Sequence, residues 1–258
     1  MNPPRAVQPA VVDVKDSTAT WHLRLLGGFR CGNGTGEVTL TGGAVGVLTY
    51  LAVHRSPVSR SALAGLLWPE VPEQRARGNL RSALWRLSKR DHGLLDGDLS
   101  EVSIAPGTQV DYWEATAWMH RVLSGCATTA DLLVDPDRFG RELVPGYDAD
   151  WLCLERERLR QGWIHAVEEL ARSLLARGSY GKAIGAALAA IAADPLRESA
   201  HQVAIECHLA EHNITEARRA QRSYARLIEA ELGIAPSPQF QHMVEHAVAP
   251  QRLVTAAG

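Results

Sequence analysis

A self-similarity with a period of 34 residues constrains the fold of this chain more than any other feature of its sequence. Four segments with helical periodicity follow one another without an intervening strand pattern, over residues 151–178, 179–195, 196–213 and 214–233. The residues aligned by the period are Leu175 with Leu209, Ala176 with Ala210, Gly178 with His212, Tyr180 with Ile214, and Ala183 with Ala217. This pattern predicts antiparallel helix pairs that stack on one another, with small residues where helices cross closely.

The period is typical of tetratricopeptide repeats, in which two helices form one unit. Two units are too few to fold alone, so we expect an earlier helix over Tyr112–Leu123 to complete the core. The motif GSYGKA over Gly178–Ala183 lacks the spacing and the hydroxyl residue of a phosphate-binding loop. It is therefore interpreted as the turn between two repeat helices.

The stretch Glu73–Arg90 is predicted to form one amphipathic helix with a basic face. Its apolar stripe consists of Ala76, Leu80, Ala83, Leu84 and Leu87. The opposite side gathers Arg75, Gly78, Arg81, Ser82, Trp85 and Lys89, and Arg77 and Arg86 flank it. A helix that is buried on one side and positive on the other is what a major-groove reader needs. The alternative is a solvated helix face, because arginine is the default basic residue here, at 24 Arg to 3 Lys.

The elements around this helix predict a winged helix-turn-helix. We expect a strand at Trp21–Leu26 paired with Val38–Leu40, with turns in the glycine-rich segment between them. Two helices should follow, one from a Thr41 cap to about His54 and one over Arg60–Leu67 capped by Ser59. After the basic helix we expect a hairpin of Leu94–Asp96 with Glu101–Ile104 around Gly97 and Asp98. The third helix, Glu73–Arg90, would then enter the groove of DNA.

Charge divides the chain into two parts. Residues 21–104 carry ten basic and seven acidic side chains, whereas residues 105–258 carry fifteen and twenty. A basic front and an acidic rear fit a nucleic-acid reader joined to a module with other partners.

The remaining composition favours a reduced, cytoplasmic setting. The four cysteines are scattered without C-x-x-C spacing, which argues against a zinc ribbon or a disulfide framework. No apolar run approaches the ~20 residues that span a bilayer, so we expect no membrane association. Residues 1–20 lack the pattern of a secretory signal and are interpreted as a disordered tail, and residues 249–258 as a second tail.

Two sets of motifs carry a resemblance to a known family. VLTYLAVH (Val47–His54) and VSRSALAGLLWPEVPEQRARGNLRSALWRLSK (58–89) resemble the DNA-binding domain of the actinobacterial antibiotic regulatory proteins, the SARP-type regulators. Leu143–Gln161, Ala193–His201 and Glu231–Phe240 resemble the bacterial transcriptional activation domain that follows it in these proteins. The resemblance implies a mostly α chain, with an α+β winged helix over 21–104 and an all-α, tetratricopeptide-like domain over 107–248.

The resemblance also implies a function. It predicts a sequence-specific transcriptional activator, cytoplasmic and nucleoid-associated, that serves a biosynthetic cluster for an antibiotic or another secondary metabolite. Such a protein would bind direct repeats in double-stranded DNA near a promoter, with two protomers side by side as a homodimer. It would then recruit RNA polymerase holoenzyme.

If the protein is such a regulator, we expect the basic helix to contribute most of its affinity for DNA. Base-facing positions are expected at Arg75, Arg81, Ser82, Trp85 and Lys89, and phosphate contacts at Arg60, Arg77 and Arg86. Trp85 would contact a thymine methyl or a sugar, or would instead pack on the wing or the rear domain. Two departures stand out, because residues 41–46 carry no basic side chain and the wing tip carries Asp96, Asp98 and Glu101. These acids would repel phosphates.

Other functions are less well supported by the sequence. The pairs His208/His212 and His242/His246 have the i, i+4 spacing of metal ligands on a helix, but no third ligand is evident. We therefore expect no metal and no cofactor. No catalytic motif appears, so an enzyme is not expected. The main alternative is a tetratricopeptide-like adaptor whose winged helix docks a protein instead of DNA.

Overall fold

The computed structural model describes residues 20–40, 42–90 and 93–248, and it is mostly helical with a small β region at the front. In the front part β1 (His22–Arg24), β2 (Arg30–Asn33), β3 (Gly36–Val38) and β7 (Gln109–Val110) form one sheet in the order β3-β2-β1-β7. A second sheet has the order β4-β6-β5, from β4 (Val58–Ser59), β5 (Leu95–Gly97) and β6 (Glu101–Ile104). The predicted fold class is confirmed.

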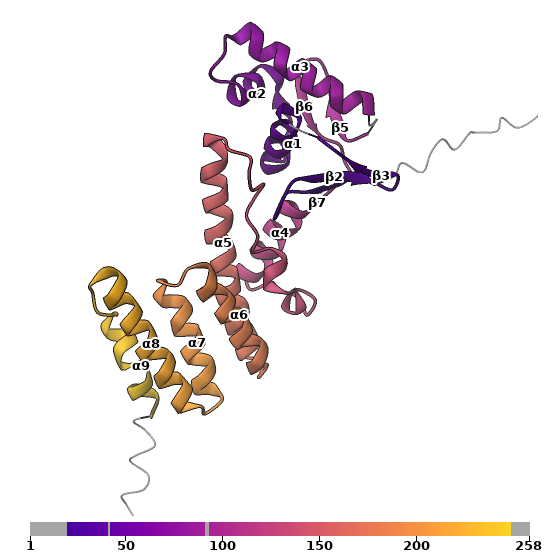
Figure 1. The fold of residues 1–258 in the computed structure, drawn as a ribbon. Coiled ribbons are helices and arrows are strands. Elements are labelled where there is room, and N and C mark those ends of the chain that lie inside the picture. Colours follow the sequence, from indigo (N-terminus) through magenta and orange to yellow (C-terminus); the bar gives the residue numbers. More distant parts are fainter. Residues whose placement is uncertain (1–19, 41, 91–92, 249–258) are drawn as a thin grey trace, which may run out of the picture.

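Three helices lie between and beside these sheets. They are α1 (Gly43–His54), α2 (Arg60–Leu67) and α3 (Glu73–Arg90). The predicted hairpin is present as β5 and β6, with Asp96 opposite Ser103. In this order, three helices followed by a hairpin make the winged helix-turn-helix that the sequence predicted, and α3 lies at one end of the molecule (Figure 1).

The strand pairing in the glycine-rich segment was predicted wrongly. Val38 pairs with Cys31 of β2 and not with the first strand, whose partner is β2 itself, through Leu23 and Cys31. Cys31 is 1% exposed, so the segment carries one apolar residue that the front core buries. The turn is made by the side chain of Asn33, which accepts a hydrogen bond from the Thr35 amide at 3.0 Å.

The two expected helix caps also differ from the prediction. Thr41 lies outside the described residues, and the residue that precedes α1 is Gly42, with φ of 57°. Ser59 does precede α2, but its hydroxyl group makes no capping hydrogen bond and lies 3.0 Å from the hydroxyl group of Ser61 instead. The helix bounds, by contrast, agree with the prediction for α2 and α3.

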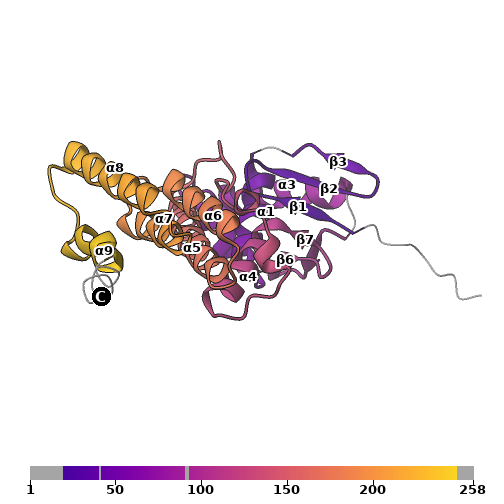
Figure 2. The same cartoon turned by 90° about the horizontal axis from the view of Figure 1, so that it is seen from below.

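The rear part consists of helices that pack side by side (Figure 2). They are α4 (Asp111–Leu123), α5 (Asp150–Leu175), α6 (Tyr180–Ala193), α7 (Glu198–Ala210), α8 (Ile214–Leu232) and α9 (Pro238–Val248), with short 3-10 turns at Asp131–Leu133 and Pro136–Arg138. Gly178 and His212, which the 34-residue period aligns, both have left-handed φ angles, of 70° and 58°. Ala183 and Ala217, also aligned, are both fully buried. Within the described residues no helix is long and apolar enough to cross a membrane.

The front sheet and the rear helices share one continuous apolar core, which runs from Trp21 to Cys207. Strand β7 pairs in parallel with β1, and the Asp111 carboxylate at the start of α4 accepts hydrogen bonds from the amides of Leu25 (2.8 Å) and Leu26 (3.0 Å). Residues beyond 104 therefore complete the front sheet. A smaller second cluster around Tyr224 and Phe240 joins α7, α8 and α9.

The carboxyl end of α1 is held by aromatic side chains of the rear part. The Trp113 indole N–H donates to the carbonyl oxygen of Ala52 at 2.6 Å, and Trp151 meets Tyr50 edge to face with ring centroids 5.0 Å apart. Because α1 also packs against α3, these contacts fix the orientation of α3 relative to the rear helices.

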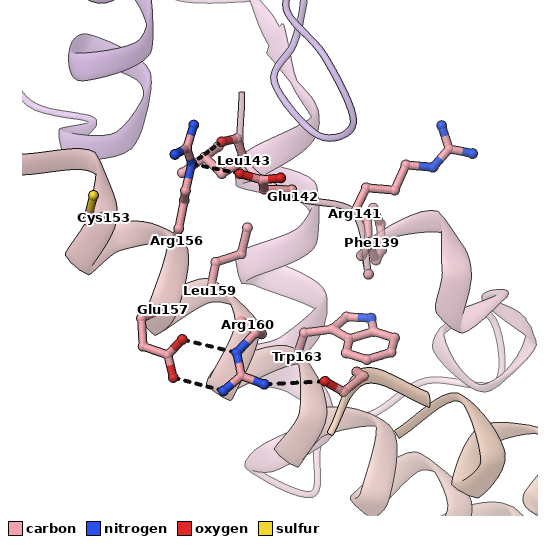
Figure 3. Close-up of a pocket in the computed structure, with 12 residues that line it drawn as sticks. Phe139, Arg141, Glu142, Leu143, Cys153, Arg156, Glu157, Leu159, Arg160 and Trp163 are labelled. Carbon is pink, nitrogen blue, oxygen red and sulfur yellow. Dashed lines mark hydrogen bonds and ion pairs between the residues drawn. The ribbon is translucent and has the colours of Figure 1, made fainter. Parts of the chain in front are cut away.

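The loop between the 3-10 turns and α5 is held by one arginine. Arg156 donates to the carbonyl oxygens of Leu143 (2.8 Å), Val144 (2.7 Å) and Tyr147 (2.9 Å), and it pairs with Glu142 at 3.3 Å. Figure 3 shows Arg156 reaching from α5 toward Leu143 and Glu142. Val144 has a φ of 43°, which is unusual for a β-branched residue and needs such external support.

Candidate nucleic-acid interface

The basic helix α3 is positioned by its apolar stripe. The five predicted core residues, Ala76, Leu80, Ala83, Leu84 and Leu87, are all buried, with at most 9% exposure. The stripe packs α3 against α1 and α2. The helix begins directly after Pro72, and Glu73 in its first turn carries the negative charge that a helix N-terminus favours. The sequence therefore fixes which side of α3 faces away from the protein.

The predicted base-facing residues share this outer side. Arg75, Arg81, Ser82 and Trp85 are exposed, and Trp85 keeps 59% of its surface accessible. The Ser82 hydroxyl group donates to the carbonyl oxygen of Gly78 at 3.0 Å, so its oxygen remains an acceptor toward a ligand. The α3 backbone reaches Arg90, but the Lys89 side chain lies outside the described residues.

The arginines predicted to contact phosphates differ in whether they already pair with a carboxylate of this chain. Arg86 is exposed, and in the described part of the chain neither Arg75, Arg81 nor Arg86 forms an ion pair. Arg77 pairs with Glu73 on the same helix, where both side chains are more than half exposed. Such an exposed pair contributes roughly 0–1 kcal/mol, so a phosphate can replace the carboxylate.

Arg60 links α2 to the wing. Its amide donates to the carbonyl oxygen of Ser100 at 2.9 Å, and its Nε to that of Glu101 at 3.5 Å. The guanidinium group keeps its other N–H donors for a ligand. The structure therefore gives Arg60 a structural role, in holding the hairpin against α2, that the sequence pattern did not indicate.

A groove of about 750 Å³ lies between the start of α2, α3 and the wing tip. It is lined by Ser59, Arg60, Ser61, Glu73, Gln74, Arg77, Leu80, Arg81, Leu84, Leu99 and Ser100. Three of the predicted arginines thus share one groove with three serines. Serine hydroxyl groups and arginines are common contacts to phosphate oxygens. The three serines and Gln74 were not predicted from the sequence. Ser59 and Ser61 lie at the start of α2, Gln74 lies at the start of α3, and Ser100 lies at the wing tip.

The acidic wing tip is largely engaged with its own backbone. Oδ1 of Asp98 accepts hydrogen bonds from the Ser100 amide (2.7 Å), the Ser100 hydroxyl group (2.7 Å) and the Glu101 amide (2.9 Å). These bonds, with the Ser100 hydroxyl group first, lower the pKa of Asp98 to about 2. Asp98 therefore shapes the turn and presents Leu99, which is 96% exposed, at the tip. The wing tip offers an apolar side chain as well as the predicted charge.

Another pocket, of about 440 Å³, lies at the junction of the two parts, lined by side chains of α5 and of the loop before it (Figure 3). Two of its arginines are already paired: Arg156 as described, and Arg160 with Glu157 through two bonds of 3.0 Å. In Figure 3 the third, Arg141, extends away from both. These contacts support a structural role for the paired arginines.

Only one of the two histidine pairs lies on a single helix, as the i, i+4 spacing of metal ligands requires. α7 ends at Ala210, so His212 lies beyond the helix in a left-handed conformation and does not share a helix face with His208. His242 and His246 both lie on α9 with stacked rings. In the ranges that the structure describes, no three His, Cys, Asp or Glu side chains come together as a metal site.

Comparisons with known proteins find one domain model that matches part of the rear helices. Residues 139–247 match the model of the bacterial transcriptional activator domain. The structure of Mycobacterium tuberculosis EmbR in complex with a low affinity phosphopeptide has a similar fold, with a TM-score of 0.73 and 21% sequence identity. The alignment covers 90% of this chain and 66% of the EmbR chain, just under two thirds of its length. No curated protein matches. The match confirms the predicted resemblance of the rear part to this activation domain, and the solved structure shows a similar fold.

Proposed function

We propose that this chain is a SARP-type transcriptional regulator and that it binds double-stranded DNA with α3 in the major groove. The observation that carries the proposal is the outer side of α3, where Arg75, Arg81 and Arg86 are exposed without a carboxylate partner in the described residues. A cationic helix face of this kind attracts the phosphate backbone, and arginine can fork onto the edge of guanine. Arg75, Arg81, Ser82, Trp85 and Lys89 are the proposed base-facing residues.

Phosphate contacts are proposed for the groove beside α3. Arg60, Arg77 and Arg86 would set the register of the protein on the duplex without reading its sequence. Arg60 and Arg77 line the groove itself, together with the hydroxyl groups of Ser59 and Ser61. The division of residues 21–104 and 107–248 into reader and activation domain belongs to the same proposal.

The finer assignments rest on the family resemblance. We propose that two protomers bind direct repeats side by side, that the activation domain recruits RNA polymerase holoenzyme, and that the regulated promoter serves secondary metabolism. The rigid joint between α1 and the rear helices supports this arrangement, because it would hold the activation domain in one orientation on the DNA.

A gel shift against a selected duplex library tests the DNA contact. We expect sequence-specific retention that weakens steeply with salt, since each neutralised phosphate releases counterions. Arg81→Ala should abolish specific retention, because it removes a bidentate donor from the centre of the face. The matched control is Arg177→Ala, which removes an exposed arginine just beyond the end of α5. This variant should retain the duplex as the wild type does.

One observation favours the alternative, a protein-docking winged helix. Leu99 is an almost fully exposed apolar side chain on the rim of the α3 groove, and apolar side chains of this kind also mark protein contacts. An adaptor would show no duplex retention even at low salt. That result would reject the regulator mechanism proposed here.

A further inference from the structure

A row of arginines runs along the outer side of α8, far from the proposed DNA interface. Arg218, Arg222 and Arg226 follow one another at four-residue spacing and are all exposed, with Arg219 beside them. Residues four apart lie on one side of a helix, so the three form a continuous positive stripe. The opposite side of α8 packs on α7 and α9 through Ala217, Tyr224 and Ile228.

The stripe differs from most other arginines of the rear part, although Arg141 and Arg177 also form no ion pair within the described residues. Arg121, Arg138, Arg156, Arg158, Arg160, Arg172 and Arg197 each pair with a carboxylate of this chain. Arg219 pairs with Glu216 at 3.7 Å. Within the described residues, Arg218, Arg222 and Arg226 form no ion pair, and the Nε atoms of the last two donate to carbonyl oxygens of their own helix.

The three arginines of the stripe form no ion pair with a described residue, although they belong to an acidic part of the sequence. Residues 105–258 carry twenty acidic and fifteen basic side chains, so carboxylates are in excess in this part of the sequence. Three neighbouring like charges repel one another, and this repulsion destabilises an isolated helix. A partner with carboxylates at a matching spacing would relieve it and would gain charge-assisted hydrogen bonds to the guanidinium groups.

DNA is the less suitable partner for this stripe. Helix α8 lies at the opposite end of the molecule from α3 in Figure 1, and Figure 2 also places it away from the front sheet. The 26 residues of α5 alone span about 39 Å between them at 1.5 Å per residue. The segment of a duplex that α3 binds would therefore lie at the other end of the molecule from α8.

We propose that the α8 stripe of Arg218, Arg222 and Arg226 binds an acidic segment of a partner protein. The partner class is a polypeptide with carboxylates spaced about one helical turn apart. This inference goes beyond the proposed DNA binding and does not depend on it, because it concerns another surface and another class of ligand.

Fluorescence anisotropy with the full chain tests the proposal. The probe is a labelled peptide with glutamate at every fourth position, and its matched control has glutamine at those positions. We expect the glutamate peptide alone to bind, with an affinity that falls as salt rises. The triple variant Arg218→Gln, Arg222→Gln, Arg226→Gln should weaken binding about tenfold, since exposed pairs contribute modestly and add along the row.

A second triple variant controls for net charge. Arg158→Gln, Arg172→Gln, Arg177→Gln removes the same number of charges from α5 and its end, and it should leave peptide affinity unchanged. Circular dichroism melting checks that both variants fold. Equal loss in both triple variants would show a general charge effect and overturn the proposal, as would equal binding of the glutamine peptide.

Two further outcomes would replace the proposed partner by another. If the α8 variant loses non-specific duplex binding in a gel shift, the stripe is a nucleic-acid surface. If sedimentation shows a dimer that the α8 variant abolishes, the occupant is a second copy of this chain. Retention of operator DNA by the α8 variant is expected, so failure of this proposal is distinguishable from failure of DNA binding through α3.

Discussion

Tyr147 packs directly against Gly46, so that the loop leading to α5 touches the first helix of the winged part. A Cβ atom on Gly46 would meet the Tyr147 hydroxyl oxygen and would lie 3.1 Å from its ring carbon Cζ. Gly43, one turn earlier, has Trp68 in the same role, with the ring carbon Cζ2 at 2.6 Å from an added Cβ. The two glycines of α1 therefore allow close approach of aromatic side chains.

Gly46→Ala should destabilise the protein. Crowding in a packed site costs typically 1–3 kcal/mol, and the better helix propensity of alanine offsets about 1 kcal/mol of it. We expect the free energy of unfolding to fall by about 1 kcal/mol, measured by urea denaturation. Gly65→Ala in α2 is the control, because an added Cβ there meets no atom within 4 Å, and it should be stabilising. Equal effects of the two changes would contradict the proposed packing.

Arg156→Gln should loosen the joint between the two parts. The change removes charge-assisted hydrogen bonds to three carbonyl oxygens from a side chain that is only 18% exposed. We expect a loss of about 3 kcal/mol in the free energy of unfolding. Faster amide hydrogen exchange at residues 143–147 should accompany it. Arg219→Gln on α8 removes only an exposed pair with Glu216 and should cost under about 1 kcal/mol.

The helices and the wing could be predicted from the sequence because their signals are local. The apolar stripe of α3 and the Gly97–Asp98 turn each lie within one short segment, and the structure agrees with both. Strand β2 could not be predicted in the same way, since its residues Arg30–Asn33 resemble a turn and Cys31 is its only buried apolar side chain. Its pairing depends on neighbours that the fold supplies.

Long-range contacts account for the rest of what the sequence did not indicate. The bond from the Leu25 amide to Asp111 joins residues 86 apart, and nothing near either residue predicts it. The groove beside α3 likewise needs the wing tip to approach the start of α2, through the bond from Arg60 to Ser100. The exposed side of α3 was predictable, but the serines that share its groove were not.

Asp131→Asn should make the free energy of unfolding depend less on pH in the acid range. The Arg121 guanidinium, at 2.7 Å, is the main cause that lowers the pKa of Asp131, and Thr128 adds two hydrogen bonds. A carboxyl group whose folded pKa is lowered contributes stability above its unfolded pKa, near 3.9, and loses it as pH falls toward the folded value. At pH 7 the variant should therefore be less stable by about 2 kcal/mol.

Urea unfolding at pH 7, 5 and 3 measures this dependence. The difference between the wild type and Asp131→Asn should stay constant from pH 7 to 5 and narrow at pH 3. Thr128→Val is a useful companion, because it removes the hydroxyl donor at 2.7 Å and leaves the Arg121 pair in place. A difference that does not change with pH would show that Asp131 acts through shape and not through charge.

Gly78→Ala should separate stability from DNA binding on α3. An added Cβ at Gly78 meets no atom within 4 Å, so the fold itself gives no reason for glycine in mid-helix, where it costs about 1 kcal/mol relative to alanine. Gly78 lies on the same side as Arg75, Ser82 and Trp85, so a glycine there lets a ligand approach the backbone closely. We expect the melting temperature to rise and the affinity for operator DNA to fall at least fivefold. Gly185→Ala on α6, which also has open space around it, should raise the melting temperature and leave DNA affinity unchanged. If Gly78→Ala binds DNA as tightly as the wild type, the duplex does not approach α3 at this turn, and the base-facing side must be centred further along the helix, toward Trp85.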